Sequence, residues 1–312
     1  MYWYRTYIKY LMRTFLITGS AGFMGSHLVK KIISDKNNFV YSYDRKQIKI
    51  KSKNLRHEVI DLKYKKKFPT VDCVIHLAAF NGTKFFYEKP LEVINDNLQS
   101  TMNILNFYNK KKCKLFVYAG SPESIAGATD YFKMPVPSSE NYPVVIEDIT
   151  NPRWSYGLTK AVGELAAANS KLPYIIIRYH NVYGPGQKDH FVPDFIERIL
   201  KNKQYILNGY NDSRSFMYID DAINATMKII QEKKCMNQII NVGSINEQKI
   251  LSVAKKIMKI LGHKKKLKLN NSPIGSAKRR CPNINKLIKF TKHKDLHTLE
   301  QGLKKTIASY KK

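Results

Sequence analysis

The order of apolar and polar positions predicts strands that alternate with helices along the first 180 residues. Apolar residues at helical spacing predict helices between short apolar runs, and the run at 71–79 is continuous, as in strands buried on both faces. Such alternation specifies parallel strands joined by crossover helices, so the predicted fold class is α/β, a doubly wound parallel sheet of the Rossmann type. The predicted strands are 14–18, 39–44, 71–79, 114–120 and 173–179, and the helices 23–34, 91–108 and 154–168.

The pattern loosens after residue 180 into turn-rich segments with shorter helices, near 191–200 and 250–261 and at the end of the chain. We expect residues 13–180 to form a nucleotide-binding layer, to which a helix and a strand within 215–243 return. Residues 181–214 and 244–312 then form a smaller C-terminal substrate-binding lobe. In sheets of this kind the crevice between the two parts is the default ligand site.

Residues 1–12 form an aromatic leader that Arg5 and Lys9 interrupt, without the small-residue cleavage site of a signal peptide. Two interpretations stay open for it: a disordered end or a non-native extension.

Composition argues against a membrane-spanning, a disulfide-rich and a zinc-binding protein. No apolar run approaches the roughly 18 residues of a membrane-spanning helix. The spacing of the four cysteines fits neither a disulfide framework nor a zinc site, so we expect reduced thiols, no metal and a cytoplasmic location. The cysteines are Cys73, Cys113, Cys235 and Cys281.

The chain is strongly basic, with 54 Lys and Arg against 24 Asp and Glu and a formal net charge of +30. The lysines are scattered in short clusters, which weakens an interpretation as a nucleic-acid-binding protein. A field of this sign equally favours a small phosphate-bearing ligand.

A glycine-rich loop follows the first predicted strand and opens the first helix. Its glycines permit a tight turn and a close approach of the backbone to a pyrophosphate, while the helix N-terminus offers N–H groups to the phosphates. The expected contacts in this loop are Gly19, Gly22, Phe23, Met24 and Gly25.

Asp44 ends the second predicted strand, 19 residues after Gly25. A carboxylate there accepts hydrogen bonds from a ribose diol and repels a 2′-phosphate. The combined pattern predicts dinucleotide binding and favours NAD as the cofactor, although Arg45 leaves NADP open.

Tyr156 and Lys160 are four residues apart and therefore lie on one face of a helix. A tyrosine acts as a general base near neutral pH only when its pKa is lowered, and we expect the Lys160 cation to lower it. Ser121 follows a strand and supplies a hydroxyl for the same substrate oxygen.

These motifs resemble, in order, those of the extended short-chain dehydrogenases/reductases, specifically the NAD-dependent nucleotide-sugar epimerases and dehydratases. The resemblance runs from about Arg13 to the end of the chain. It rests on TGSAGFMG, Asp44, Asp61-Leu62, HLAA (76–79), Asn97, Tyr156/Lys160, HNVYGP (180–185), RSFMYIDD (214–221) and RRCPNI (279–284).

The resemblance implies further roles. Asp61 and Leu62 would flank the adenine, and Asn97 would support the proton-relay region behind Lys160. The partner would be a nucleotide-diphosphate sugar. Leu77, Ala78 and Ala79 would line the cofactor, Asn181 would bond the sugar or pyrophosphate, and Arg214 and Arg280 would hold the diphosphate.

The segment 119–127 bears on the reaction. Ser121 takes the hydroxyl position of the family pattern and Glu123 its glutamate, but Pro122 stands where a 4,6-dehydratase carries an aspartic acid. Proline cannot protonate a leaving hydroxyl, which counts against dehydration. Glu123 is either a ring-proton base or a loop carboxylate.

The resemblance therefore implies an epimerase that acts through a transient keto-sugar in surface polysaccharide or glycan precursor synthesis. A 4,6-dehydratase or a decarboxylase of the family is the alternative. A Rossmann-like RNA-binding or regulatory protein is the rival from another class, although we expect no nucleic-acid partner and no membrane.

Family members usually form homodimers through two helices. The apolar stripe from Leu91 along 91–108, together with Leu158, Val162 and Leu165, fits such a contact or a monomer's core.

Overall fold

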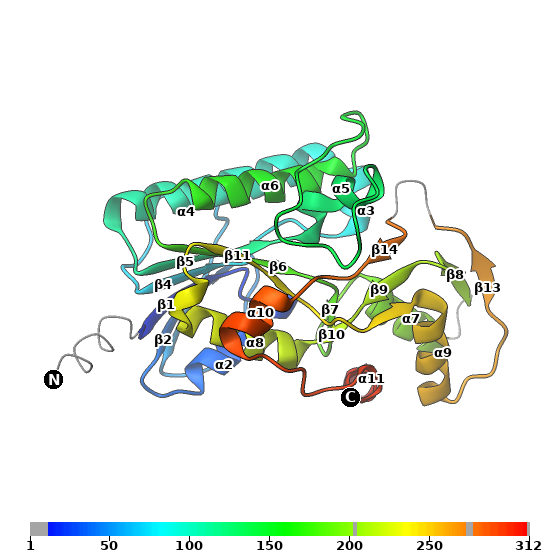
Figure 1. Cartoon of the computed structure of the whole chain (residues 1–312). Helices are drawn as coiled ribbons and strands as arrows, with labels where there is room; N and C mark the ends of the chain where they lie inside the picture. Colours follow the sequence, from blue (N-terminus) through cyan, green and yellow to red (C-terminus); the bar gives the residue numbers. More distant parts are fainter. Residues whose placement is uncertain (1–11, 202–204, 273–276, 311–312) are drawn as a thin grey trace.

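A computed structural model describes residues 12–201, 205–272 and 277–310. Seven parallel strands form a central sheet in the order β11-β6-β5-β4-β1-β2-β3. The chain leaves β1 in one direction through β2 and β3, and then crosses to β4 on the other side of β1 (Figure 1). The strands are β1 (Thr14–Thr18), β2 (Phe39–Asp44), β3 (Leu55–Val59), β4 (Cys73–His76), β5 (Leu115–Gly120), β6 (Tyr174–Tyr179) and β11 (Gln238–Val242).

Helices cover both faces of this sheet, which confirms the predicted doubly wound architecture. One face carries α4 (Pro90–Lys111) and α6 (Trp154–Ala168), and the other carries α2 (Phe23–Ile33), α8 (Ile219–Gln231) and α10 (Asn285–Thr291) (Figure 1).

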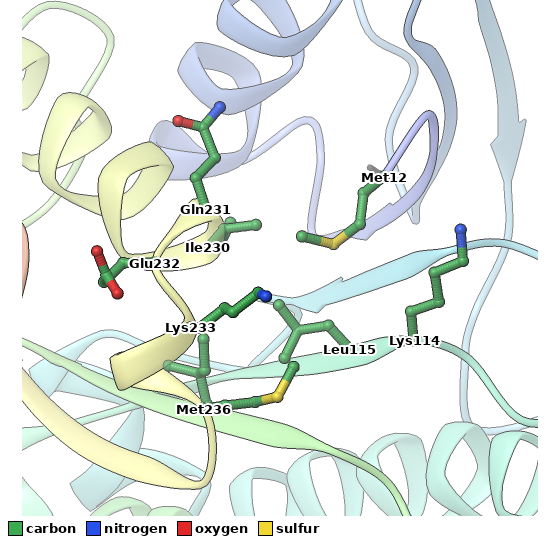
Figure 2. Close-up of a pocket in the computed structure, with 9 residues that line it drawn as sticks. Met12, Lys114, Leu115, Ile230, Gln231, Glu232, Lys233 and Met236 are labelled. Carbon is green, nitrogen blue, oxygen red and sulfur yellow. The ribbon is translucent and has the colours of Figure 1, made fainter. Parts of the chain in front are cut away.

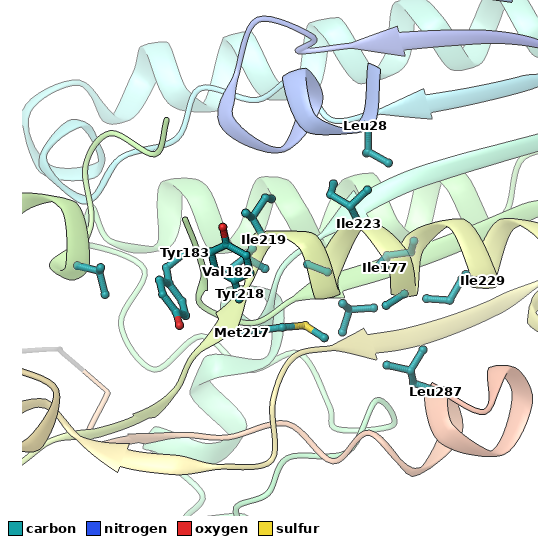
Figure 3. Packing of buried hydrophobic residues seen from close by; sticks show 14 of the residues in the cluster. Leu28, Ile177, Val182, Tyr183, Met217, Tyr218, Ile219, Ile223, Ile229 and Leu287 are labelled. Carbon is teal, nitrogen blue, oxygen red and sulfur yellow. The ribbon is translucent and has the colours of Figure 1, made fainter. Parts of the chain in front are cut away.

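Alternate side chains of the central strands feed two separate hydrophobic clusters. In β1, Phe15 and Ile17 join the cluster beneath α2 and α8, whereas Leu16 joins the cluster beneath α4. Figure 3 shows Leu28 and Ile223 within the first cluster. Burial on both faces explains the continuous apolar runs of the central strands.

The remaining described elements lie mostly beyond the carboxyl ends of the strands. Two short ladders, β10 with β7 and β8 with β13, flank a three-stranded sheet in the order β12-β9-β14. These elements are α3 (Thr83–Glu88), η1 (Pro122–Ile125), α5 (Ala126–Asp130), β7 (Val182–Tyr183), α7 (Phe191–Leu200), β8 (Ile206–Asn208), β9 (Ser213–Ser215), β10 (Met217–Tyr218), η2 (Lys233–Cys235), β12 (Glu247–Lys249), α9 (Ile250–Leu261), β13 (Lys268–Asn270), β14 (Arg279–Arg280) and α11 (Leu299–Tyr310).

The apolar stripe predicted on α4 is divided between the surface and the core, where Leu105 is buried. Leu91 is 79% exposed and Met102 41%, while polar side chains such as Asp96 and Asn97 occupy the buried face. A monomer's core is therefore the wrong interpretation for these two positions.

Within the described part of the chain, no helix combines the length and the apolar character that crossing a bilayer requires. The leader lies outside the described residues, apart from Met12.

Candidate active site

The segments predicted to hold the cofactor follow four neighbouring strands. The glycine loop follows β1, Asp44 ends β2, the Asp61–Leu62 pair lies after β3, and residues 77–79 follow β4. Because β4, β1, β2 and β3 are adjacent and parallel, these segments all lie at the carboxyl ends of the strands. There they meet at the point where the strand order reverses.

The glycine loop is closely packed. Gly19 has φ +70°, and a Cβ there would lie 2.8 Å from the Ala78 backbone nitrogen. A Cβ on Gly25 would lie 2.2 Å from the Gly19 carbonyl oxygen. Larger residues are therefore excluded at both positions.

The first turn of α2 carries no acidic residue, and no side chain caps its N-terminus at Gly22. The N–H groups of this first turn are therefore not neutralised by an acidic or capping side chain, which leaves them available to a phosphate. Phe23 and Met24 pack partly against the first hydrophobic cluster.

Asp44 is tied to this loop. Its carboxylate oxygens accept hydrogen bonds from the Ala21 backbone N–H (2.9 Å) and the Lys46 backbone N–H (2.9 Å). The carboxylate therefore stands beside the glycine cradle, where a ribose diol would be recognised. Loop and carboxylate together fit a dinucleotide.

Asn97 links the segment after β4 to the helix that carries Tyr156. Its side chain accepts a hydrogen bond from the Phe80 backbone N–H (2.6 Å) and donates one to Thr159 Oγ1 (3.2 Å). His76 lies deeper, between Thr18 Oγ1 and Thr101 Oγ1, and burial lowers its pKa to about 3.

The structure brings Tyr156, Lys160 and Ser121 together. Tyr156 is only 7% exposed, stacks on Phe86 at 4.7 Å between ring centroids, and forms a hydrogen bond with Ser121. Lys160 Nζ lies 5.8 Å from the Tyr156 ring centroid and donates to the Ala119 carbonyl oxygen at 2.8 Å.

The expected lowering of the Tyr156 pKa is wrong for the protein without its cofactor. Burial raises this pKa to about 12, opposed by the hydrogen bond with Ser121 and reinforced by Glu164. Burial also lowers the pKa of Lys160 to about 8, which Glu164 opposes. Burial dominates both shifts because both groups are withdrawn from water.

Glu164 supports the loop that carries Ser121 and Glu123, and it was not predicted as a site residue. Its Oε1 accepts hydrogen bonds from Ser124 Oγ (3.1 Å) and from the Ser121 backbone N–H (3.4 Å). Arg178 donates to both Glu164 oxygens, and the two side chains are 4% and 6% exposed. The available signal was spacing, since Glu164 follows Tyr156 and Lys160 at four-residue steps on α6.

Glu123 is held in an ion-pair cluster. Arg280 contacts both of its carboxylate oxygens, one of them at 2.9 Å, and Arg153 Nη2 lies 3.5 Å from Oε2. Both oxygens of the Glu123 carboxylate are thus already engaged by guanidinium groups, which favours the loop-carboxylate interpretation.

The other predicted substrate contacts lie near this cluster. A small pocket lined by Pro122, His180 and Arg280 opens beside the loop that carries Ser121 and Glu123. Asn181 adopts φ +40°, and its buried Nδ2 has no hydrogen-bond partner among the described residues. Arg214 donates to the Ala277 carbonyl oxygen at 2.6 Å and so holds the segment before β14.

A second pocket lies at the opposite edge of the sheet, at the amino ends of the strands. Met12, Leu115, Ile230 and Met236 line it (Figure 2). None of the predicted site residues contributes to this pocket.

Comparison with known proteins agrees with this geometry. The model of the NAD dependent epimerase/dehydratase family matches residues 15–243. A UDP-N-acetyl-alpha-D-glucosaminuronate decarboxylase of Bacillus cytotoxicus is 32% identical, over 94% of this chain and 96% of its own. A putative UDP-glucose 4-epimerase of Methanocaldococcus jannaschii is 32% identical over 75% of this chain and 78% of its own.

Among solved structures, a UDP-glucuronic acid 4-epimerase of Bacillus cereus, in complex with UDP-glucuronic acid and NAD, superimposes with a TM-score of 0.84. It is 24% identical and covers 96% of this chain and 99% of its own, a likeness that shows the fold. With the family model spanning most of the chain, the protein belongs to the NAD-dependent epimerase/dehydratase family and is an enzyme that uses NAD.

Proposed function

We propose that this enzyme is a UDP-sugar 4-epimerase that acts through a transient 4-keto-sugar. The observation that carries the proposal is that the loop of residues 121–123 offers no free acid or base at positions 122 and 123. Pro122 replaces the acid of a dehydratase, and Glu123 is paired with Arg280 and Arg153. Ser121 is then the residue of this loop that assists Tyr156 and Lys160. Together these three side chains can transfer a proton at one sugar hydroxyl.

In the proposed reaction Tyr156 accepts the proton of the sugar 4-hydroxyl, and Ser121 hydrogen-bonds the same oxygen. NAD held by the glycine loop and Asp44 would supply the hydride acceptor for C4 and the hydride donor for its opposite face. Lys160 contributes positive charge near the phenol. The glycine loop and Asp44 hold the dinucleotide, and the segments that carry Asn181, Arg214 and Arg280 bind the nucleotide-sugar.

Decarboxylation is the second candidate, favoured by the Bacillus cytotoxicus relative that spans nearly the whole chain. It requires a uronic acid substrate, whose 4-keto form loses carbon dioxide. The first step is the same, so the residues with assigned roles do not separate the two reactions.

The product separates them. Purified enzyme is incubated in deuterated water with NAD and, in turn, UDP-glucose, UDP-N-acetylglucosamine, UDP-glucuronic acid and the matching GDP and dTDP sugars. Epimerisation yields the C4 epimer with no deuterium on the ring carbons, whereas decarboxylation releases carbon dioxide. A 4-keto-6-deoxy product, or no turnover by an NAD-loaded enzyme, would rule out the proposal.

Tyr156→Phe should abolish turnover and leave NAD bound. Tyr64→Phe is the matched control, because that side chain is 76% exposed and remote in sequence from the catalytic residues. Equal activity of the two variants would contradict the role of Tyr156.

We also propose that two copies pair through α4 and α6. Exposed apolar side chains on these contacting helices are a surface that water disfavours. They are Leu91, Met102, Val162 and Leu165. All four cysteines are free, which supports a reducing compartment, and we place the enzyme in the cytoplasm, in the supply of glycan precursors.

A further inference from the structure

Four charged side chains form a closed network beside Asp44. Asp96 of α4 contacts both cations of the network, Arg45 through Nη2 and Lys63 through Nζ at 2.7 Å. Asp61 Oδ2 lies 3.4 Å from Arg45 Nε and 3.9 Å from Lys63 Nζ. The network thus joins the residues that follow β2 and β3 to the middle of α4.

Arg45 has an ambiguous position for an enzyme that uses NAD. It directly follows Asp44, the carboxylate expected at the ribose. An arginine near this carboxylate is the group that accommodates the 2′-phosphate of NADP in related folds. The chain therefore carries both a group that rejects this phosphate and one suited to bind it.

Asp96 is the most buried member of the network. Its side chain is 6% exposed, against 49% for Arg45, 29% for Asp61 and 19% for Lys63. Burial raises the pKa of Asp96, but the hydrogen bonds from Lys63 and Arg45 outweigh burial and leave the pKa below its ordinary value. A buried carboxylate that stays ionised holds its cations firmly.

A purely structural role for Asp96 is already filled by a neighbour. Asn103, two turns further along α4, donates hydrogen bonds to the carbonyl oxygens of Leu62 (2.9 Å) and Lys63 (2.7 Å). These bonds fasten the segment after β3 to the helix without any charge. What Asp96 adds is a negative charge that engages Arg45 and Lys63.

We propose that Asp96 is a cofactor-specificity residue, which keeps Arg45 and Lys63 occupied and so withholds them from the 2′-phosphate of NADP. The preference for NAD then has two parts. Asp44 repels the extra phosphate, and Asp96 removes the cations that would otherwise compensate for that repulsion.

The test is the ratio of dissociation constants for NADP⁺ and NAD⁺, measured by titration calorimetry. Asp96→Asn should lower this ratio about tenfold, equivalent to one well-placed charge interaction of about 1.4 kcal/mol. Its NAD⁺ affinity should change little. The double variant Asp96→Asn/Arg45→Gln should return the ratio toward that of the wild type.

Asp35→Asn is the matched control. It makes the same change in net charge, and it breaks an exposed ion pair with Arg13 at the amino end of β1. The ratio should not move in this variant. If it falls as far as in Asp96→Asn, general attraction by a basic protein explains the result and the proposal fails.

Two other outcomes would overturn the proposal: an unchanged ratio in Asp96→Asn with normal NAD⁺ affinity, or a full gain that persists in the triple variant Asp96→Asn/Arg45→Gln/Lys63→Gln. Arg45→Gln alone gives a test that does not depend on removing the buried carboxylate. Because Arg45 is already occupied, this variant should leave NADP⁺ affinity unchanged, and a severalfold loss would refute the idea.

Discussion

In the protein free of NAD, Tyr156 should be a neutral phenol throughout the range in which the enzyme works. Burial has raised its pKa to about 12. The Lys160 ammonium, 5.8 Å from the ring centroid, offers about 3 kcal/mol at an effective dielectric constant of about 20, or roughly two pKa units. That contribution is smaller than the gap between a pKa of about 12 and one near 7, which is about five pKa units or about 7 kcal/mol.

Lys160 alone therefore cannot bring the phenol to a pKa near 7. Positive charge that arrives with the oxidised cofactor is the remaining source. Lys160 helps only while it is protonated, and its pKa of about 8 means that this help fades above that pH. We therefore expect NAD⁺ binding to lower the Tyr156 pKa and Lys160→Met to raise it by about two units in the NAD⁺ complex.

The assay is NMR of protein labelled with ¹³C at tyrosine Cζ, titrated with and without NAD⁺. Tyr156→Phe identifies the resonance. Lys160→Met should also move the acidic limb of the pH–rate profile upward by about the same two units. A Tyr156 phenolate near pH 8 in the nucleotide-free protein, or an unshifted profile in Lys160→Met, would refute this reasoning.

Three further predictions concern stability and assembly. Glu164→Gln leaves the buried Arg178 without its charge partner, so urea unfolding should show a loss of about 3–5 kcal/mol, and a loss below about 1 kcal/mol would contradict the buried pair. The pKa of His76 is about 3 in the folded protein, below its value in the unfolded chain, so the unfolded chain binds a proton first as the pH falls. The free energy of unfolding should therefore fall by about 1.4 kcal/mol per pH unit below about pH 6.5. In urea unfolding from about pH 7 to 5, His76→Asn should show a shallower dependence on pH. Leu165→Glu should give monomers in light scattering with NAD affinity retained. The same change at Ile149, which is more exposed than Leu165, should leave the dimer intact, and a dimer in both variants would place the interface elsewhere.

Local spacing was sufficient to predict where the candidate cofactor residues lie in the fold, while their roles stay predictions. The glycine loop and Asp44 lie at the ends of consecutive strands, and Tyr156 and Lys160 lie on one face of a helix. Short-range periodicity alone therefore places the members of each pair near one another. The doubly wound sheet followed for the same reason, because strands buried on both faces read as continuous apolar runs.

The edge strand β3 could not be predicted in this way. Its sequence LRHEV has no apolar alternation, and all five of its residues keep some exposure. It forms because β2 offers an unpaired edge, with Val40 to Asp44 in parallel register against Leu55 to Val59. Backbone pairing, rather than side-chain pattern, determines this element.

Tertiary structure alone decided the electrostatics. Glu123 meets Arg280 across 157 residues of sequence, and Arg45 meets Asp96 across 51. Because of these contacts, Glu123 is an ion-paired carboxylate rather than a free base, and Arg45 is already paired rather than free to bind a phosphate. Sequence determined which ionisable groups the site contains, whereas folding determined their partners and their burial, and therefore which of them keep their charge and their freedom to react.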